Sequence, residues 1–364
     1  MTEELIDRIY EAAFVPDEWP KVLEVAGDLS GSASGAVMVF RDDGSVRGRS
    51  VDFVRPLFQE FVSSEMWRTS DSVKRMSGLQ PTQFIHVDEF LTPEQIEQDP
   101  MRTRLRELGI GAALCSTITM PSGEIVQFVF QRWLRTGPTY SQVAVDGLNQ
   151  LRPHFARAGL MSARLSFERA QATVSALAAL GLPAAVLTSS GRVVTANALL
   201  ESLPTAFLPT AFGGLAIANA AADALLQQAI SDARFSAAPV VRSIPVAPTS
   251  ERCAMIVHVL PLRRSAHDIF GGADILVAAT EVQASNLVPS PSILIGLFDL
   301  SSSEARLATA LASGLSLKEA ATQSHVTVKT CRTYLEKIFA KTGTHRQGEL
   351  VALLKAAQPI RTGK

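Results

Sequence analysis

The sequence is poor in residues that several classes of protein require. Its 364 residues include only three cysteines, Cys115, Cys253 and Cys331, and no Cys-x-x-Cys pair. This excludes a disulfide framework and a cysteine-based zinc site. It is typical of a protein that stays in a reducing cytoplasm.

Enzyme motifs are absent as well. The chain contains no P-loop, no G-x-S-x-G, no H-E-x-x-H and no Rossmann glycine triplet. Its six histidines are scattered, and an isolated one such as His154 or His258 is more often a satisfied surface or core residue than a haem ligand. We therefore expect no enzyme activity, no catalytic residues, no metal site and no cofactor.

Long apolar runs are also missing. No uninterrupted apolar run reaches about eighteen residues, and the closest, residues 174–187, is broken by Gly181 and Pro183. The amino terminus, MTEELIDRIYEAAF, is acidic and amphipathic, and it lacks the basic and apolar regions of a secretion signal. We expect a soluble, cytoplasmic protein without membrane contact.

Charge is scarce and unevenly distributed. Charged residues make up 19% of the chain, and the net charge is −1. Residues 299–364 carry ten basic and five acidic side chains, a net +5, which leaves −6 for the rest. Positive charge gathered on one small segment is the electrostatic signature of a nucleic-acid binder.

The carboxy-terminal segment is expected to form four short helices, each with its own start signal. Serine or threonine stands at each expected N-cap, twice with glutamate three residues later in a capping box. Glycines end the first and third helices. In chain order the signals are Ser301 with Glu304, Gly314, Ser316 with Glu319, Thr327, Gly343 and, for a fourth helix ending near Ala357, Thr344.

A short second helix, a tight turn at residues 325–326 and a longer third helix form a helix-turn-helix pattern. The third helix has an apolar face for the core and a polar face that should enter the major groove. Lys337 and Lys341 flank the polar face and suit DNA phosphates. The predicted core face is Cys331, Leu335, Ile338 and Thr342, and the predicted groove face is Lys329, Arg332, Thr333 and Glu336.

This segment resembles the LuxR-type DNA-binding domain of bacterial transcription regulators. The resemblance implies an all-α helix-turn-helix domain over residues 297–364, in which Arg332 and Thr333 meet base edges. The matching positions are Leu300, Glu304, Gly314, Ser316, Glu319, Ala321, Val326, Thr327, Thr330, Ile338, Lys341, Gly343, Glu349, Leu350 and Val351. The predicted DNA-binding residues are Thr327, Lys329, Thr330, Arg332, Thr333, Glu336, Lys337 and Lys341. The implied dimerisation stripe is Leu350, Leu353, Leu354 and Ala357.

Two α+β units are expected in front of this domain, so the fold class is multidomain. Residues 1–165 are similar in architecture to a PAS or GAF sensor. The expected elements are two helices in residues 1–30, strands at 36–40 and 46–51, helices at 56–66 and 93–108, strands at 113–120 and 125–133, and a helical stretch at 141–171 that Pro153 and Gly159 threaten to break.

Residues 175–285 resemble a PAS domain. The resemblance is carried by AVLTSSGRVVTANALLESL at residues 185–203, in which Asn197 is expected to cap local backbone. A helix over residues 142–180 is expected to join the two units. Residues 286–296, with prolines at 289 and 291, are the predicted linker.

Six aromatic residues of the first unit admit two interpretations. They can line a ligand pocket, or they can form ordinary core, which is the commoner use of such residues. The residues are Phe53, Phe58, Phe61, Trp67, Phe84 and Phe90.

The favoured function is a bacterial, sequence-specific transcription regulator whose front units sense a signal. Its partners would be double-stranded DNA with an imperfect inverted repeat and a second copy of the chain. A small-molecule ligand and RNA polymerase are compatible further partners. Two alternatives stay open: a non-enzymatic signalling or interaction protein, and a constitutive dimeric DNA binder without ligand control.

Overall fold

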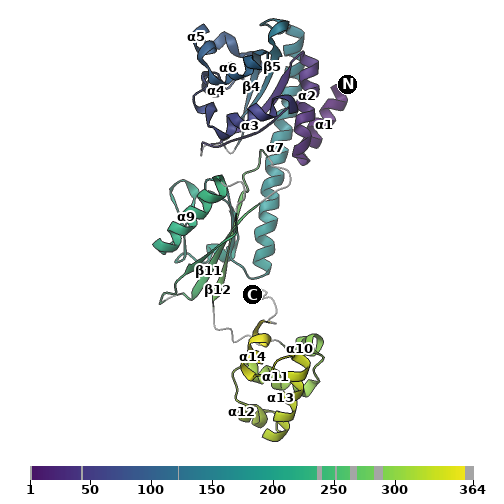
Figure 1. Cartoon of the computed structure of the whole chain (residues 1–364), viewed down its shortest axis with the longest axis vertical. Coiled ribbons are helices and arrows are strands. Elements are labelled where there is room, and N and C mark those ends of the chain that lie inside the picture. Colours follow the sequence, from purple (N-terminus) through teal and green to yellow (C-terminus); the bar gives the residue numbers. More distant parts are fainter. Residues whose placement is uncertain are drawn as a thin grey trace.

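The computed structural model describes residues 2–356 except 42, 43, 122, 236–239, 251, 263–268 and 283–289. Three units follow one another along the chain (Figure 1). The first two are α+β units joined by one long helix, and the third is all-helical. This agrees with the predicted multidomain α+β and helical composition.

The first unit is a five-stranded antiparallel sheet covered on both faces. Its strand order is β2-β1-β5-β4-β3. Helices α1, α2 and α7 pack on one face around Trp19 and Phe155, and α3 and α4 cover the other around Phe61 and Met76. The elements are α1 (Thr2–Phe14), α2 (Trp19–Ser30), β1 (Ser34–Phe40), β2 (Val46–Ser50), α3 (Arg55–Ser63), α4 (Asp71–Leu79), β3 (Ile85–His86), α5 (Pro93–Gln98), α6 (Pro100–Glu107), β4 (Ile110–Thr119), β5 (Ile125–Trp133) and α7 (Gln142–Ala179).

One helix prediction for this unit was wrong. The single helix expected at 93–108 is two helices, because Asp99 has an extended backbone before Pro100 and caps α6. The joining helix expected over residues 142–180 is confirmed as α7, which has 38 residues, and the break risked at Pro153 or Gly159 does not occur. Leu151 and Phe155, buried on either side of Pro153, hold the helix together across the missing backbone hydrogen bond.

The second unit repeats the sheet topology of the first. Its strand order is β10-β11-β12-β6-β7. If the five strands of each sheet are numbered in chain order and the second sheet is read from β7, both sheets have the order 2-1-5-4-3. Helix α9 covers one face, and the carboxy-terminal half of α7 covers the other through Ala170 and Val174. The elements are β6 (Ala184–Leu187), β7 (Val193–Ala196), α8 (Ala198–Glu201), β8 (Phe207–Pro209), β9 (Leu215–Ile217), α9 (Ala220–Phe235), β10 (Arg242–Val246), β11 (Ala254–Pro261) and β12 (Ile275–Val282).

The third unit starts earlier than predicted. Residues 291–296, expected in the linker, belong to helix α10, and residues 286–289 lie outside the described part. Leu294 of α10 is fully buried in the third unit's core. The fourth predicted helix begins at Gln347 rather than Thr344. The elements are α10 (Pro291–Phe298), α11 (Ser302–Ala312), α12 (Leu317–Gln323), α13 (Val328–Thr342) and α14 (Gln347–Ala356).

Asn197 ties α7 to the second sheet. Its carboxamide oxygen accepts hydrogen bonds from the backbone N–H groups of Leu200 (3.0 Å) and Ala184 (3.1 Å). Its nitrogen donates to the carbonyls of Leu182 (2.9 Å) and Val174 (3.0 Å). The side chain is 6% exposed, so all four bonds are shielded from water. The predicted capping role is confirmed.

Replacing Asn197 with alanine should destabilise the second unit strongly. The change removes the side-chain partner of four backbone groups, and each buried group left without any partner costs roughly 1–3 kcal/mol. The Leu200 N–H keeps the backbone carbonyl of residue 197 as an acceptor at 3.0 Å. The control is Asn219→Ala, which removes a single cap bond to Ala222 N–H and should cost about 1 kcal/mol. Urea unfolding of both variants, followed by circular dichroism, measures the difference. Equal losses would contradict the role assigned to Asn197.

Candidate functional site

Helices α12 and α13 and the turn between them are built by local signals that the sequence displays. Ser316 and Glu319 form a complete capping box at the start of α12. The turn after α12 contains His325 with a positive φ of 54°, and the N–H of Val326 donates to the carbonyl of Ala321 at 3.0 Å. Thr327 then caps α13 through the N–H of Thr330 at 3.1 Å. The two helices are therefore joined by a turn with little freedom.

Helix α13 presents the two predicted faces. Cys331 (1% exposed) and Ile338 (0%) lie in the core, and Leu335 packs against it. The predicted groove residues all lie on the exposed surface, and within the described chain none of them forms an ion pair. These exposed residues are Lys329, Arg332, Thr333 and Glu336, followed by Lys337 one position on.

Thr327 and Thr330 sit at the amino-terminal end of α13. Their hydroxyl oxygens are 2.8 Å apart. Thr327 is exposed and Thr330 is half-buried. The first N–H groups of a helix carry partial positive charge, so this end of α13 suits a phosphate.

Lys341 is placed differently from the prediction. Its ammonium donates to the Glu304 carboxylate at 2.9 Å and to the Asp299 carbonyl at 2.6 Å. The Glu304 side chain is only 5% exposed. Lys341 thus joins α13 to the start of α11, and its charge is already neutralised, so the structure gives it an internal role in place of a phosphate contact.

The predicted dimerisation stripe is wrong for two of its members. Leu350 and Leu354 are both 0% exposed and lie in the third unit's own core. Leu353 is half-buried, and Ala357 lies outside the described residues. The helical spacing identified a buried face correctly, but that face is buried by α11 and its neighbours within the same chain.

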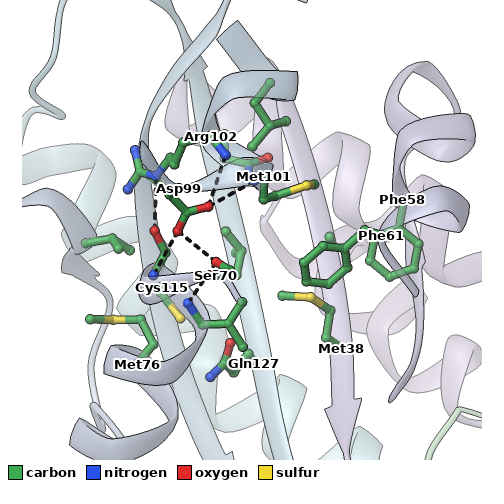
Figure 2. Close-up of a pocket in the computed structure, with 18 of the residues that line it drawn as sticks. Met38, Phe58, Phe61, Ser70, Met76, Asp99, Met101, Arg102, Cys115 and Gln127 are labelled. Atoms are coloured by element: carbon green, nitrogen blue, oxygen red, sulfur yellow. Dashed lines mark hydrogen bonds between the residues drawn. The ribbon is translucent and has the colours of Figure 1, made fainter. Parts of the chain in front are cut away.

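A cavity of about 70 Å³ lies in the first unit, between the sheet and helices α3, α4 and α6 (Figure 2). This volume is several times the roughly 10–15 Å³ that one water molecule needs. The walls are mainly apolar, and Met38, Phe58, Phe61 and Met76 line them. The cavity can therefore hold a small apolar molecule.

Only two of the six candidate pocket aromatics line this cavity. Phe58 and Phe61 do, whereas Phe84 packs in the opposite core against Phe130. Phe53 is half exposed beside Trp133, Trp67 packs on Phe40, and Phe90 is partly buried near Met76. Two of the six residues therefore line a cavity, and the other four lie elsewhere in the first unit.

The cavity's one lining carboxylate is fully engaged. One oxygen of Asp99 accepts from the N–H groups of Met101 (3.0 Å) and Arg102 (3.2 Å). The other accepts from the Ser70 hydroxyl (2.8 Å) and the Ser72 N–H (3.0 Å), as Figure 2 shows around Asp99. Asp99 is 2% exposed, so it offers a ligand little free hydrogen-bonding capacity.

Other polar groups at the cavity are neutral or paired. Arg102 forms an ion pair with Asp88. Burial raises the pKa of the Cys115 thiol to about 12, so this cysteine stays protonated and unreactive. Gln127, 1% exposed, donates to the Ser77 hydroxyl at 3.0 Å. The cavity therefore has no unpaired charge for an ionic ligand.

Sequence analysis missed Asp99, Cys115 and Gln127. A signal existed for Asp99, because an aspartate directly before a proline at the start of a helical pattern is a typical N-cap. No local signal placed Gln127 or Cys115 beside that cap, since they come from strands β5 and β4.

The two histidines considered as haem ligands have protein partners. Nδ1 of His154 lies 3.0 Å from the Tyr10 hydroxyl. His258 lies between the Ser243 hydroxyl (3.0 Å) and the Thr280 hydroxyl (3.2 Å). Among the residues that the structure describes, no cluster of three metal-ligating side chains occurs. Within the same residues, no helix combines the length and apolarity needed to span a bilayer.

Comparison with known proteins gives only distant structural likeness. No protein-family model and no curated protein matches the chain. The LBD domain of VqsR from Pseudomonas aeruginosa is 11% identical, with a TM-score of 0.36 over 44% of this chain and 94% of that one.

The N-acylhomoserine-lactone-dependent LuxR-family factor CepR2 from Burkholderia cenocepacia is 13% identical, with a TM-score of 0.33 over 44% of this chain and 93% of its own. Escherichia coli SdiA is 9% identical, with a TM-score of 0.32 over 94% and 90%. At these values the likeness assigns no function to this chain.

The Glu304–Lys341 pair should make the third unit sensitive to acid. The Lys341 ammonium, followed by the Ser301 N–H, lowers the pKa of Glu304. A lowered folded-state pKa gives stability that is complete above the ordinary carboxyl pKa of about 4.3 and is lost as the pH falls through the folded value. Glu304→Gln should therefore lower stability at neutral pH and flatten its loss on acidification.

Hydrogen-exchange protection of α11 and α13 in the full chain, measured from pH 7 downwards, checks this. Glu336→Gln is the control, because Glu336 is exposed on the same helix as Lys341 and forms no ion pair within the described residues. A pH profile of Glu304→Gln that matches the unmodified protein would contradict the assignment.

Proposed function

We propose that this chain is a sequence-specific DNA-binding transcription regulator whose first unit holds a small neutral ligand. The carrying observation is the α12–turn–α13 arrangement, which displays Lys329, Arg332, Thr333 and Glu336 on one exposed helix face, where none of them forms an ion pair with another described residue. A capped helix with one free polar face is the geometry that fits a major groove.

The exposed residues divide into two roles. Arg332 and Thr333 lie centrally on the free face of α13 and are assigned to base edges, where arginine pairs in bidentate fashion with guanine. Thr327, Thr330 and Lys337 flank that face and are assigned to phosphates, which fix orientation but carry no sequence information. Lys341 is left out of the interface because Glu304 neutralises it.

A second copy of the chain is part of the proposal. Two recognition helices about 34 Å apart would read two half-sites of an imperfect inverted repeat. The contact between copies must use surfaces other than Leu350 and Leu354, which the third unit's own core occupies. Contact with RNA polymerase would follow from binding near promoters.

The front units are proposed as one fold type, because their five-stranded sheets share the same strand order. The PAS-like resemblance of residues 175–285 and the PAS- or GAF-like architecture expected for residues 1–165 support this proposal. The first is assigned the sensory role because its cavity lies beneath α3, α4 and α6, where a ligand would contact several elements at once. The ligand is assigned as uncharged, since Asp99 and Arg102 are already paired inside the protein.

Replacing Arg332 should alter specificity, and replacing Lys337 should alter affinity. Arg332→Ala should lose about 1–3 kcal/mol at its preferred base and bind altered sites almost equally well. Lys337→Ala should weaken all sites alike and reduce the slope of log affinity against log salt by about one. Both are measured on full-length protein by selection from random duplexes, followed by titration at several salt concentrations.

Identical site preferences in Arg332→Ala and the unmodified protein would overturn the base contact. If no duplex is enriched by the full chain, the selection is repeated with cell extract present to supply a ligand. Failure there too would favour an interaction module over a DNA binder. Strong enrichment that no extract changes would favour a constitutive binder.

The neutrality of the cavity can be tested with three probes of one shape. Ethanol, which is small enough for about 70 Å³, should bind with a Kd of about 1 mM or weaker, whereas acetate and ethylammonium should not bind. Saturation-transfer NMR measures this. Ala113→Leu fills the cavity from strand β4 and should abolish the alcohol's signal. Stronger binding of either ion than of the alcohol would contradict the assignment.

A further inference from the structure

A short segment of the second unit lies inside the core of the first. Ile269 and Phe270 are 1% and 3% exposed and belong to the hydrophobic core that surrounds Trp19. The ring centroids of Phe270 and Trp19 are 5.5 Å apart. This segment, residues 269–274, is called the strap below.

Helix α7 has a glycine where the strap enters. A Cβ atom at Gly159 would lie 3.1 Å from the Phe270 ring, which is closer than side chains normally approach. Any other residue at 159 would push the ring outwards. The glycine that threatened to break α7 in the sequence therefore makes room for the strap.

The strap is also held by charge. The Asp274 carboxylate forms ion pairs with Arg41 (3.2 Å) and Arg47 (2.7 Å), which lie on either side of the β1–β2 turn. The Arg41 side chain is 4% exposed, and it also donates to the Gly271 carbonyl. The N–H of Ser189 in the second unit donates to the same Asp274 carboxylate at 2.9 Å. Asp274 is thus bound by both units.

The strap and the cavity lie on opposite faces of the same strand. On β5, Gln127 and Val129 line the cavity. Phe128, between them, points to the other face. Its ring centroid lies 5.8 Å from that of Trp19 and 4.6 Å from that of Phe155, on which it stacks. On β1, Met38 lines the cavity, and Arg41, which directly follows this strand, contacts the strap. A ligand that moves β5 or β1 therefore moves the surface on which the strap rests.

The strap continues directly into the strand that leads to the third unit. Asp274 is followed by β12 (Ile275–Val282), which pairs with β11 and β6 in the second sheet. Beyond β12 the chain passes to α10 of the third unit. Movement of the strap therefore affects the beginning of β12, and the end of β12 precedes the third unit.

We propose that the strap is a conformational relay. When it is docked in the core of the first unit, the two front units unfold together as one cooperative body. A change in the cavity alters this docking and thereby the beginning of β12. Docking needs only the contacts described above. The effect on DNA binding rests additionally on the proposed function, so the two parts are tested separately.

Docking is tested in full-length protein whose Trp67 and Trp133 are replaced by phenylalanine, which leaves Trp19 as the single tryptophan. Phe270→Ala should raise the acrylamide quenching constant of Trp19 at least threefold and split one calorimetric transition of the front units into two. Phe212→Ala, which removes a ring that is 94% exposed, should change neither. Unchanged quenching in Phe270→Ala would overturn docking.

Asp274→Asn keeps the strap's apolar residues and weakens the bonds that Arg41, Arg47 and the Ser189 N–H make to its side chain. It should give an intermediate rise in quenching, and it decides the question if Phe270→Ala does not fold. Separate melting of the front units in the unmodified protein would also overturn their cooperative unfolding.

The relay is tested by filling the cavity. Ala113→Leu should change the amide exchange rates of residues 269–274 at least threefold. These residues pack on the opposite face of the sheet from Ala113. Ala352→Leu, an exposed substitution on α14, is the matched control. Unchanged exchange in Ala113→Leu overturns the relay. Changed exchange with no change in DNA affinity keeps the relay but removes its link to the proposed function.

Discussion

The packing of one continuous helix against two separate sheets is the constraint on which the front of this protein depends. At 38 residues, α7 is about 57 Å long. Large side chains such as Leu151 and Phe155 are buried in its first half. Small ones follow at Ala158, Gly159 and Ser162, where the strap approaches. Because side-chain volume decreases along α7, this one helix can pack against the cores of both units. It also leaves space for the strap at Gly159.

The third unit depends on a different kind of constraint. Its core is small and rich in alanine, so the apolar area that it buries is limited. Two capping boxes, a threonine cap and the Glu304–Lys341 pair fix the helix ends and join α13 to α11. Among the described residues, the polar side chains on the outer face of α13 form no ion pair and no hydrogen bond to another helix.

Local features of the fold were predictable from the sequence, and features that need a distant partner were not. Caps such as Thr327 act within four residues, so they were predicted correctly. The burial of Leu350 and Leu354 was also visible in their spacing, but spacing cannot tell which surface covers them. Lys341 looked like a free cation because Glu304 is 37 residues away. The composition of residues 286–296 suggested a linker because Pro291 marks a helix start as well as a loop.

The position of Phe270 in the first unit's core bears on synthesis. Trp19 and Gly159 leave the ribosome long before the residue that fills the space between them. At about 5–20 residues per second, the first unit must wait on the order of 5–20 s after α7's midpoint is made before its core can close. During that interval Trp19 borders an unfilled apolar surface. Truncation before residue 270 would leave that surface without the ring that covers it.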